Sequence, residues 1–203
     1  MADETPVTAD TPPDGFVVGH DHVTLVGSNE ADTVAFYRDV LGLSLVTRQP
    51  NLDRPEVTHL FFDAGDGRLI TFFVDESRDS DAEPQDPGVG TVHHVAFRVT
   101  TAEIPEIRDR LREAGHEFSE FDRGAFHALY TRDHNGLTIE LAADAYEIPD
   151  ERRGEVLATA HGARVDDGAT HVQREHVEAA LEELGLPVVE TGAPDAPHGT
   201  GDL

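Results

Sequence analysis

Similar segments occur twice in this chain, and this repeat constrains its fold more than any other feature. Residues 22–25 (His-Val-Thr-Leu) match residues 94–97 (His-Val-Ala-Phe), and residues 69–72 (Leu-Ile-Thr-Phe) match residues 137–140 (Leu-Thr-Ile-Glu). The matching segments lie about 70 residues apart, which is longer than the repeat of common solenoid proteins. We therefore expect two copies of one module, with two curved sheets that face each other across a shared cavity.

Each copy is expected to contain one strand, a helix and three further strands. Apolar residues at helical spacing, each time followed by a glycine, indicate helices near 30–41 and 102–114. Alternating apolar residues and turn signals indicate the strands. These are expected near 19–26, 43–49, 58–63 and 69–75 in the first copy, and near 91–99, 117–122, 126–132 and 137–142 in the second. The order β-α-β-β-β therefore occurs twice.

The remaining segments flank or connect these modules. Residues 1–15 are rich in proline and acidic residues and are expected to be a disordered tail. The first module spans 16–76, an acidic linker spans 77–90, the second module spans 91–148, and a helical extension with a tail spans 149–203. Helices of the extension are expected near 151–163 and 173–184. The predicted fold class is α+β: two βαβββ modules form a curved, partly open mixed β-barrel around a metal cavity, followed by the helical extension.

The charge balance excludes several classes of partner. The chain has 41 acidic residues against 15 basic ones, all of them arginine, and a net charge of −26. Such a chain is expected to avoid nucleic acids and anionic membrane surfaces. The acidic residues are spread over the whole sequence, and this composition resembles that of proteins from extreme halophiles. The chain has no cysteine, and neither a signal peptide nor a long apolar run is evident, so we expect a cytoplasmic protein.

One carboxylate lies in an otherwise apolar strand. Glu140 follows the turn at Asn135 and Gly136, and it shares a strand face with Thr138. Burying a carboxylate is costly unless a partner compensates its charge, and a metal ion is such a partner. Two strands of the repeat carry a histidine at corresponding positions, His22 and His94. We predict that these two histidines and Glu140 meet at one metal ion.

The predicted ligand set favours particular chemistry. Two imidazoles and one carboxylate leave open positions on an octahedral ion, which suits Fe(II) that binds a diolate and dioxygen together. In the aligned repeat, Phe72 takes the position of Glu140, so a fourth ligand from the first module is not expected. His20 and His93 neighbour the predicted ligands in sequence and are interpreted as non-ligands.

Several segments resemble a known superfamily. Residues 36–43 (Phe-Tyr-Arg-Asp-Val-Leu-Gly-Leu) and 93–99 (His-His-Val-Ala-Phe-Arg-Val) resemble signatures of the vicinal oxygen chelate proteins. That superfamily includes glyoxalase I, extradiol dioxygenases, and fosfomycin- and bleomycin-resistance proteins. Within it, residues 51–53, 58–62 and 71–73, together with the series from Asp122 to Glu140, look most like the hydroquinone-type ring-cleaving dioxygenases.

This resemblance implies roles for individual residues. His22, His94 and Glu140 would bind Fe(II), with Mn(II) as the alternative ion, and Tyr130 and Arg123 would lie beside the substrate oxygens. The implied partners are a small aromatic diol, dioxygen and a second copy of the chain in a homodimer. Members of that family typically carry four modules, whereas this sequence shows two.

One further residue is a candidate for the chemistry. His127 matches His59 in the aligned repeat and precedes Tyr130 by three residues. We therefore consider it a candidate acid or base.

Two other classes of function remain open. A glyoxalase-like lyase, isomerase or thiol transferase could use the same fold with Ni, Co or Zn as a Lewis acid. A non-catalytic small-molecule binding or resistance protein could also use it, although the predicted triad argues against that class. The fold alone does not decide between these functions.

Overall fold

A computed structural model describes residue 7 and residues 16–81, 83–85 and 88–194. The predicted tail at residues 1–15 therefore lies outside the described residues, apart from Val7, as do the last nine residues of the chain. None of the helices in the described ranges is long and apolar enough to cross a membrane.

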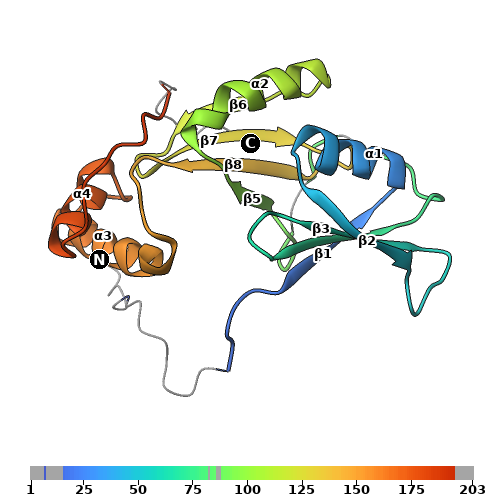
Figure 1. Ribbon diagram of the computed structural model, residues 1–203, viewed down its shortest axis with the longest axis horizontal. Helices are drawn as coiled ribbons and strands as arrows, with labels where there is room; N and C mark the ends of the chain where they lie inside the picture. Colours follow the sequence, from blue (N-terminus) through green and yellow to red (C-terminus); the bar gives the residue numbers. More distant parts are fainter. Residues whose placement is uncertain (1–6, 8–15, 82, 86–87, 195–203) are drawn as a thin grey trace.

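The described strands form two separate four-stranded mixed sheets with the same topology (Figure 1). The sheet order is β1-β4-β3-β2 in the first and β5-β8-β7-β6 in the second, and the first strand of each half pairs in parallel with the last. The sheets are open and do not close into a barrel. The bounds of the strands are β1 (His22–Gly27), β2 (Ser44–Pro50), β3 (Thr58–Asp63), β4 (Leu69–Val74), β5 (His94–Arg98), β6 (Ser119–Asp122), β7 (Phe126–Arg132) and β8 (Thr138–Asp144).

Each half contains its predicted helix between the first two strands. Helix α1 (Glu30–Val34) continues as the π-helical segment η1 (Ala35–Val40). It begins where the Asn29 side chain accepts a hydrogen bond from the backbone N–H of Asp32, and Gly42 follows it with a φ of +84°. In the second half, the short helix η2 (Thr101–Glu103) leads into α2 (Ile104–Glu113).

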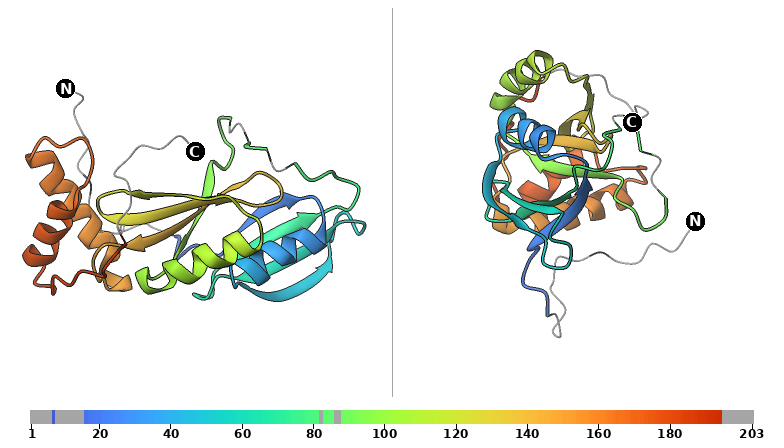
Figure 2. Two further views of the ribbon diagram at one scale, coloured as in Figure 1. Left: turned by 90° about the horizontal axis from the view of Figure 1, so that it is seen from above. Right: turned by 90° about the vertical axis from the view of Figure 1, so that its right-hand side faces the viewer.

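A single apolar core joins the two halves. Helices α1 and α2 lie along the same side of the sheets (Figure 2), and the buried residues beneath them come from both halves. The Tyr37 hydroxyl also donates a 2.9 Å hydrogen bond to Asp133 across the two halves. The helices therefore cover one face of the second sheet and leave its opposite face for a site. The core includes Phe36, Leu60, Phe62, Ile70, Phe72, Leu111, Leu129, Ile139 and Leu141.

The strand register corrects one detail of the predicted repeat. His22 pairs with Leu69 of β4, and His94 pairs with Thr138 of β8. Thr71 and Glu140 each lie two residues after these partners, so they take equivalent positions in the two halves. The expectation that Phe72 takes the position of Glu140 is therefore wrong. Phe72 is buried in the core with its ring centroid 4.5 Å from that of Tyr37, because a slip of one residue moves a side chain to the other face of a sheet.

The C-terminal extension forms a second, smaller core. Its helices are η3 (Asp150–Arg152), α3 (Arg153–Asp166) and α4 (Arg174–Glu183), close to the predicted positions. They pack against the end of the second sheet, where the Thr191 hydroxyl donates a 2.6 Å hydrogen bond to the carbonyl of Asp144. The small core consists of Ala145, Tyr146, Val156, Ala160, Val177, Ala180 and Leu181.

Candidate metal centre

Glu140 lies in the middle of β8 on the sheet face that points away from the helices. The neighbouring Ile139 and Leu141 are buried in the main core, and the alternation of a strand therefore directs Glu140 to the opposite face. Its side chain is only 8% exposed. A carboxylate in this position needs polar partners, and the structure provides two.

His94 and Tyr130 each contact one oxygen of the Glu140 carboxylate. Nε2 of His94 lies 3.0 Å from Oε2, because His94 begins β5, which runs parallel to β8. The Tyr130 hydroxyl donates a 2.8 Å hydrogen bond to Oε1, because Tyr130 in β7 is directly paired with Glu140. The β7–β8 hairpin thus keeps the register that brings this tyrosine to the carboxylate.

Arg123 adds a positive charge to this group. Its guanidinium carbon lies 5.2 Å from the ring centroid of Tyr130 and 4.9 Å from that of Phe121, which is cation–π geometry. Burial and the hydrogen bond to Glu140 raise the pKa of the Tyr130 hydroxyl, while Arg123 acts in the opposite direction. Tyr130 is therefore protonated at neutral pH and acts as a hydrogen-bond donor.

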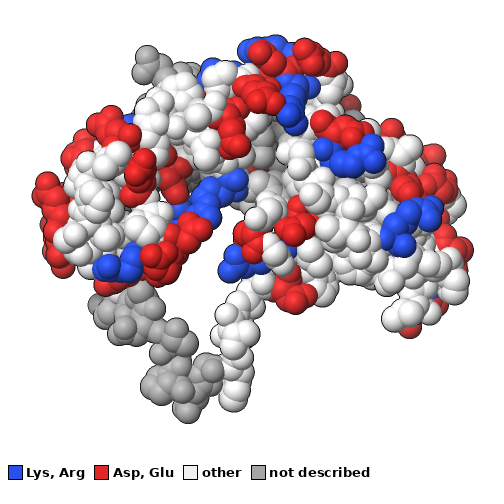
Figure 3. Space-filling view, in the orientation of Figure 1, with Lys and Arg blue, Asp and Glu red and all other residues white. Residues whose placement is uncertain are grey.

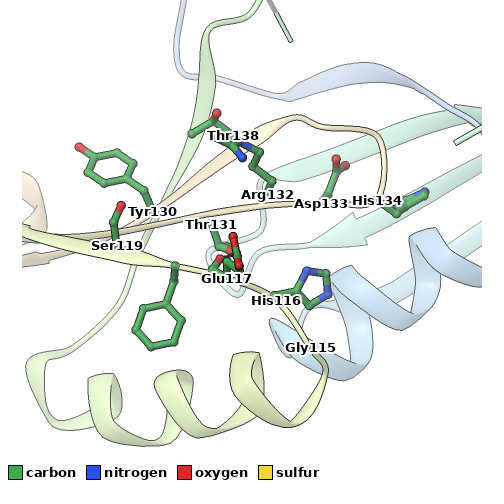
Figure 4. Close-up of a pocket in the computed structure, with 11 residues that line it drawn as sticks. Gly115, His116, Glu117, Ser119, Tyr130, Thr131, Arg132, Asp133, His134 and Thr138 are labelled. Atoms are coloured by element: carbon green, nitrogen blue, oxygen red, sulfur yellow. Dashed lines mark hydrogen bonds between the residues drawn. The ribbon is translucent and has the colours of Figure 1, made fainter. Parts of the chain in front are cut away.

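A cavity of about 580 Å³ opens beside Tyr130 (Figure 4). Ser119, Arg132 and Thr138 contribute to its walls, as does His116 on the side of helix α1. This volume lies within the usual range of pockets that bind small molecules, about 300–1,000 Å³. Tyr130 lines this cavity, whereas Glu140 and His94 are not among its lining residues, so the space for a small molecule lies next to the tyrosine.

The donor set fits a metal ion in part. Neighbouring ligands of one ion, with bonds of about 2.1 Å at a right angle, are separated by nearly the 3.0 Å found between His94 and Glu140. Within the described ranges, however, no group of three or more His, Cys, Asp or Glu side chains is close enough to hold a metal. The structure thus brings together two of the three predicted ligands.

His22 is the predicted ligand that does not join the group. It begins β1, its side chain is 44% exposed, and its Nδ1 lies 2.5 Å from Asp21. Strands β1 and β5 are edge strands of different sheets. A pocket of about 380 Å³ lies between them, with Val23 on one side and Val95 on the other.

His127 is also outside the group, because it points to the other face of β7. It is buried, and its Nε2 lies 2.9 Å from Glu120, which forms two 2.6 Å hydrogen bonds with Arg108 of α2. Burial alone would raise the pKa of the Glu120 carboxyl, but Arg108 and His127 lower it overall. The strand register also pairs His127 differently from His59, so the two are not equivalent. The structure does not bring His127 to Tyr130 and Glu140.

Phe121 belongs to the site but was not singled out in the sequence. Its ring centroid lies 6.1 Å from that of Tyr130, and it shares Arg123 with that ring. The only signal for this position is the alternation in the short strand β6, which the sequence pattern indicates weakly.

Known proteins resemble this chain in sequence. The sequence matches the model of the Glyoxalase/Bleomycin resistance protein/Dioxygenase superfamily over residues 19–141. It is 28% identical over 147 residues to "Putative ring-cleaving dioxygenase MhqA" of Bacillus subtilis (strain 168). The aligned region covers 68% of this chain and 45% of the relative. A second relative, "Putative ring-cleaving dioxygenase MhqE" of the same strain, is 28% identical over 130 residues, covering 63% of this chain and 42% of the relative. The chain thus spans less than half the length of these curated relatives.

Solved structures show the same fold. The "putative dioxygenase from Bacillus subtilis subsp. subtilis str. 168" superposes with a TM-score of 0.53 at 26% identity, and the match covers 62% of this chain and 40% of that one. A glyoxalase/dioxygenase from Nostoc punctiforme superposes with a TM-score of 0.54 at 18% identity, covering 68% of this chain and 98% of that one. On its sequence match and its duplicated fold, this chain belongs to the Glyoxalase/Bleomycin resistance protein/Dioxygenase superfamily.

Proposed function

We propose that this protein is an Fe(II)-dependent ring-cleaving dioxygenase that acts on a hydroquinone or catechol-like aromatic diol, with Mn(II) as the alternative ion. The observation that carries this proposal is the Glu140 carboxylate, which contacts His94 through one oxygen and Tyr130 through the other. Two relatives named as ring-cleaving dioxygenases support it, at 28% identity and over part of their length.

Some residues of the site would bind the ion, and others would contact the substrate. Glu140 and His94 would hold the ion. Iron(II), when bound, supplies a centre at which an aromatic diolate and dioxygen exchange electrons. Tyr130 keeps its proton at neutral pH. That proton is donated to Glu140 in this structure and would be donated to a substrate oxygen instead once the carboxylate holds the ion. Arg123, over the Tyr130 ring, favours an anionic diolate.

His22 is the proposed third ligand. It begins β1 as His94 begins β5, and each pairs with the first residue of the last strand of its half. In this structure it lies outside the Glu140 group, so binding of the ion would have to bring it there. Thr71, which takes the position of Glu140 in the first half, is not a carboxylate. A four-ligand site of the glyoxalase kind is therefore less favoured than an open three-ligand site.

The test is oxygen uptake by anaerobically purified protein that has been loaded with Fe(II), in molar KCl, with hydroquinone, methylhydroquinone and catechol. We expect uptake that follows substrate loss and disappears in His94→Ala. His22→Ala should lose metal affinity by about tenfold or more. The exposed His20 in the same segment supplies the matched control, and His20→Ala should behave like the parent protein.

Other outcomes would redirect the proposal. Metal binding that depends on His94, without any oxygen uptake, would replace the dioxygenase with a non-oxidative lyase, isomerase or transferase. Failure to bind any divalent metal would overturn the metal centre and favour a small-molecule binding protein. Equal behaviour of the His22 and His20 variants would remove His22 from the ligand set.

A further inference from the structure

A second cavity lies at the far end of the sheet that carries the candidate metal centre. It measures about 550 Å³ and lies, partly open to solvent, between the β6–β7 turn and the C-terminal helices. Most of its surface is hydrocarbon. Its apolar lining residues are Ala125, Phe126, Ile148, Leu157, Val172 and Val177.

The cavity and the metal centre share one face of the second sheet. Three successive pairs of β7 and β8 residues lie on that face, since directly opposed residues share a face and alternate pairs repeat it. The first pair is Tyr130 with Glu140, the middle pair consists of two alanines, and the last is Phe126 with Asp144. From Tyr130 to Phe126 the strand extends for about 13 Å. Ala128 of the middle pair is buried, whereas Ala142 is partly exposed, and its small side chain leaves a low floor on the β8 side between the two places.

Arg123 connects the two places directly. Its guanidinium lies over Tyr130 of the metal centre, and the same residue lines the cavity. This face of the sheet borders the hollow that Figure 3 shows between the C-terminal helices on the left and the first sheet on the right, with arginine side chains in blue along it. The metal centre and the cavity therefore lie along one face of the sheet, with Arg123 between them.

The carboxylates in the cavity wall are compensated. Asp144 pairs with Arg153, which donates one hydrogen bond of 2.8 Å and a second, shorter one. Asp122 accepts a hydrogen bond from the backbone of Gly124 and lies 3.4 Å from Arg174. With its acids paired and most of its lining apolar, the cavity suits an uncharged hydrocarbon group more than an ion.

We propose that this cavity binds an apolar substituent of the substrate, so that the protein acts on alkyl- or aryl-substituted aromatic diols. The inference rests on the proposed function for the position of the diol beside Glu140. The substituent extends past Ala142 into the cavity beneath the C-terminal helices. The extension is then part of the substrate site. Each methylene buried there is expected to tighten binding by about threefold to fourfold.

The test uses 4-alkylphenols as probes, because they lack the second hydroxyl of a diol and bind without turnover. Phenol, 4-methylphenol and 4-pentylphenol are titrated into the full chain with methyl-labelled valine and leucine, followed by NMR. We expect affinity to rise along the series, with the largest shifts at the methyl groups of Val172 and Val177. Leu157→Asp should abolish the dependence on chain length.

Val165→Asp is the matched control. Val165 lies on the same helix α3, and both residues are 42% exposed, but Val165 is not among the residues that line the cavity. This variant should bind the probes like the parent chain, and circular dichroism of both variants checks that they are folded. Equal affinities for phenol and 4-pentylphenol, or equal behaviour of the two variants, would overturn the proposal.

A parallel assay separates this inference from the proposed function. Hydroquinone, methylhydroquinone and pentylhydroquinone are compared as substrates of the Fe(II)-loaded protein. Turnover that is indifferent to the substituent would overturn the substrate class and leave the dioxygenase standing. Chain-length-dependent binding of the phenols without any turnover of the diols would refute the dioxygenase and retain the cavity as an apolar binding site.

Discussion

The Tyr130 hydroxyl donates a 2.8 Å hydrogen bond to Oε1 of Glu140, and the two residues are direct partners in the β7–β8 hairpin. One register therefore decides whether the phenol and the carboxylate meet. The other carboxylate oxygen lies 3.0 Å from Nε2 of His94. Glu140 thus lies between the Tyr130 hydroxyl, which is proposed to donate to the substrate, and the His94 imidazole, which is proposed to bind the metal.

Replacing Tyr130 with phenylalanine separates these two roles. Tyr130→Phe removes the hydroxyl but keeps the ring in contact with Arg123, so bound Fe(II) per protein should remain near the parent value. The turnover number for hydroquinone should fall by about 10²–10⁴-fold, the usual contribution of a positioned proton donor. Metal content by atomic absorption and oxygen uptake measure the two effects.

Glu140→Gln is the companion variant, because it keeps the size of the side chain and removes its charge. It should lose both the metal and the activity. If Tyr130→Phe also lost its iron, the tyrosine would be needed to position the carboxylate, and its assignment as a substrate donor would have to be withdrawn.

Gly124 is predicted to hold the β6–β7 turn against the C-terminal extension. Its φ is +81°, and a Cβ at this position would lie 2.9 Å from the carbonyl oxygen of Val172. Gly124→Ala should therefore lower the free energy of unfolding by at least about 1–2 kcal/mol, the cost of a left-handed backbone for an L-residue. Urea unfolding followed by circular dichroism measures this change.

Gly162 provides the comparison. It lies exposed within α3, and a Cβ there would meet nothing within 4 Å. Gly162→Ala should raise the free energy of unfolding by about 0.5–1 kcal/mol. Equal effects of the two substitutions would contradict the close approach of the turn to the extension.

Acidification is expected to destabilise the protein through two partly buried histidines, His134 and His116. Burial lowers the pKa of His134 and of His116, against the opposing effect of Asp133. Histidines of the unfolded chain have a pKa of about 6.5. Below that pH they bind protons in the unfolded chain, while these two histidines stay neutral in the folded chain. The free energy of unfolding should thus fall as the pH falls below about 6.5, until the folded pKa values are reached, by at most about 1.4 kcal/mol per pH unit for each group.

Urea midpoints at pH 7.5, 6.5 and 5.5 test this dependence, in a range above the titration of most carboxylates. His134→Gln removes one of the two groups and should make the dependence shallower. A parent midpoint that stays constant over this range would show that neither histidine titrates differently on folding.

Salt should stabilise the fold, because the chain carries a net charge of −26. Repulsion among the carboxylates is screened over about 10 Å in 0.1 M salt and over about 3 Å in 1 M salt. The exposed ion pairs that salt also weakens contribute little by comparison. The melting temperature should therefore rise between 0.1 M and 2 M KCl. A flat profile would remove the basis for the halophile-like interpretation of the composition.

Local patterns determined the elements that the sequence could predict. The predicted strands 58–63 and 126–132 coincide with β3 and β7, because alternating side chains and the turns beside them are encoded within a few residues. The predicted helix start near residue 30 also agrees with α1, where Asn29 acts as the N-cap. The presence of Glu140 on an otherwise apolar strand was visible for the same reason.

Relations between distant segments were decided only by the tertiary structure. The parallel pairing of the first and last strands shows that Thr71, and not Phe72, takes the position in the first half that Glu140 takes in the second. This could not be predicted, because no local signal sets a register across a whole module. His127 lies on the opposite face of β7 from Tyr130, because the two residues are three positions apart in the strand.

The chain by itself therefore determined two βαβββ modules and the candidate residues, since these depend on periodicity and turn chemistry. Only the tertiary structure decided which candidates meet. It brought Tyr130, His94 and Arg123 around Glu140 and left His22 on a separate sheet edge. The physical reason is that the packing of the two halves on one core, and of the second sheet against the C-terminal helices, depends on apolar contacts that no short sequence pattern specifies.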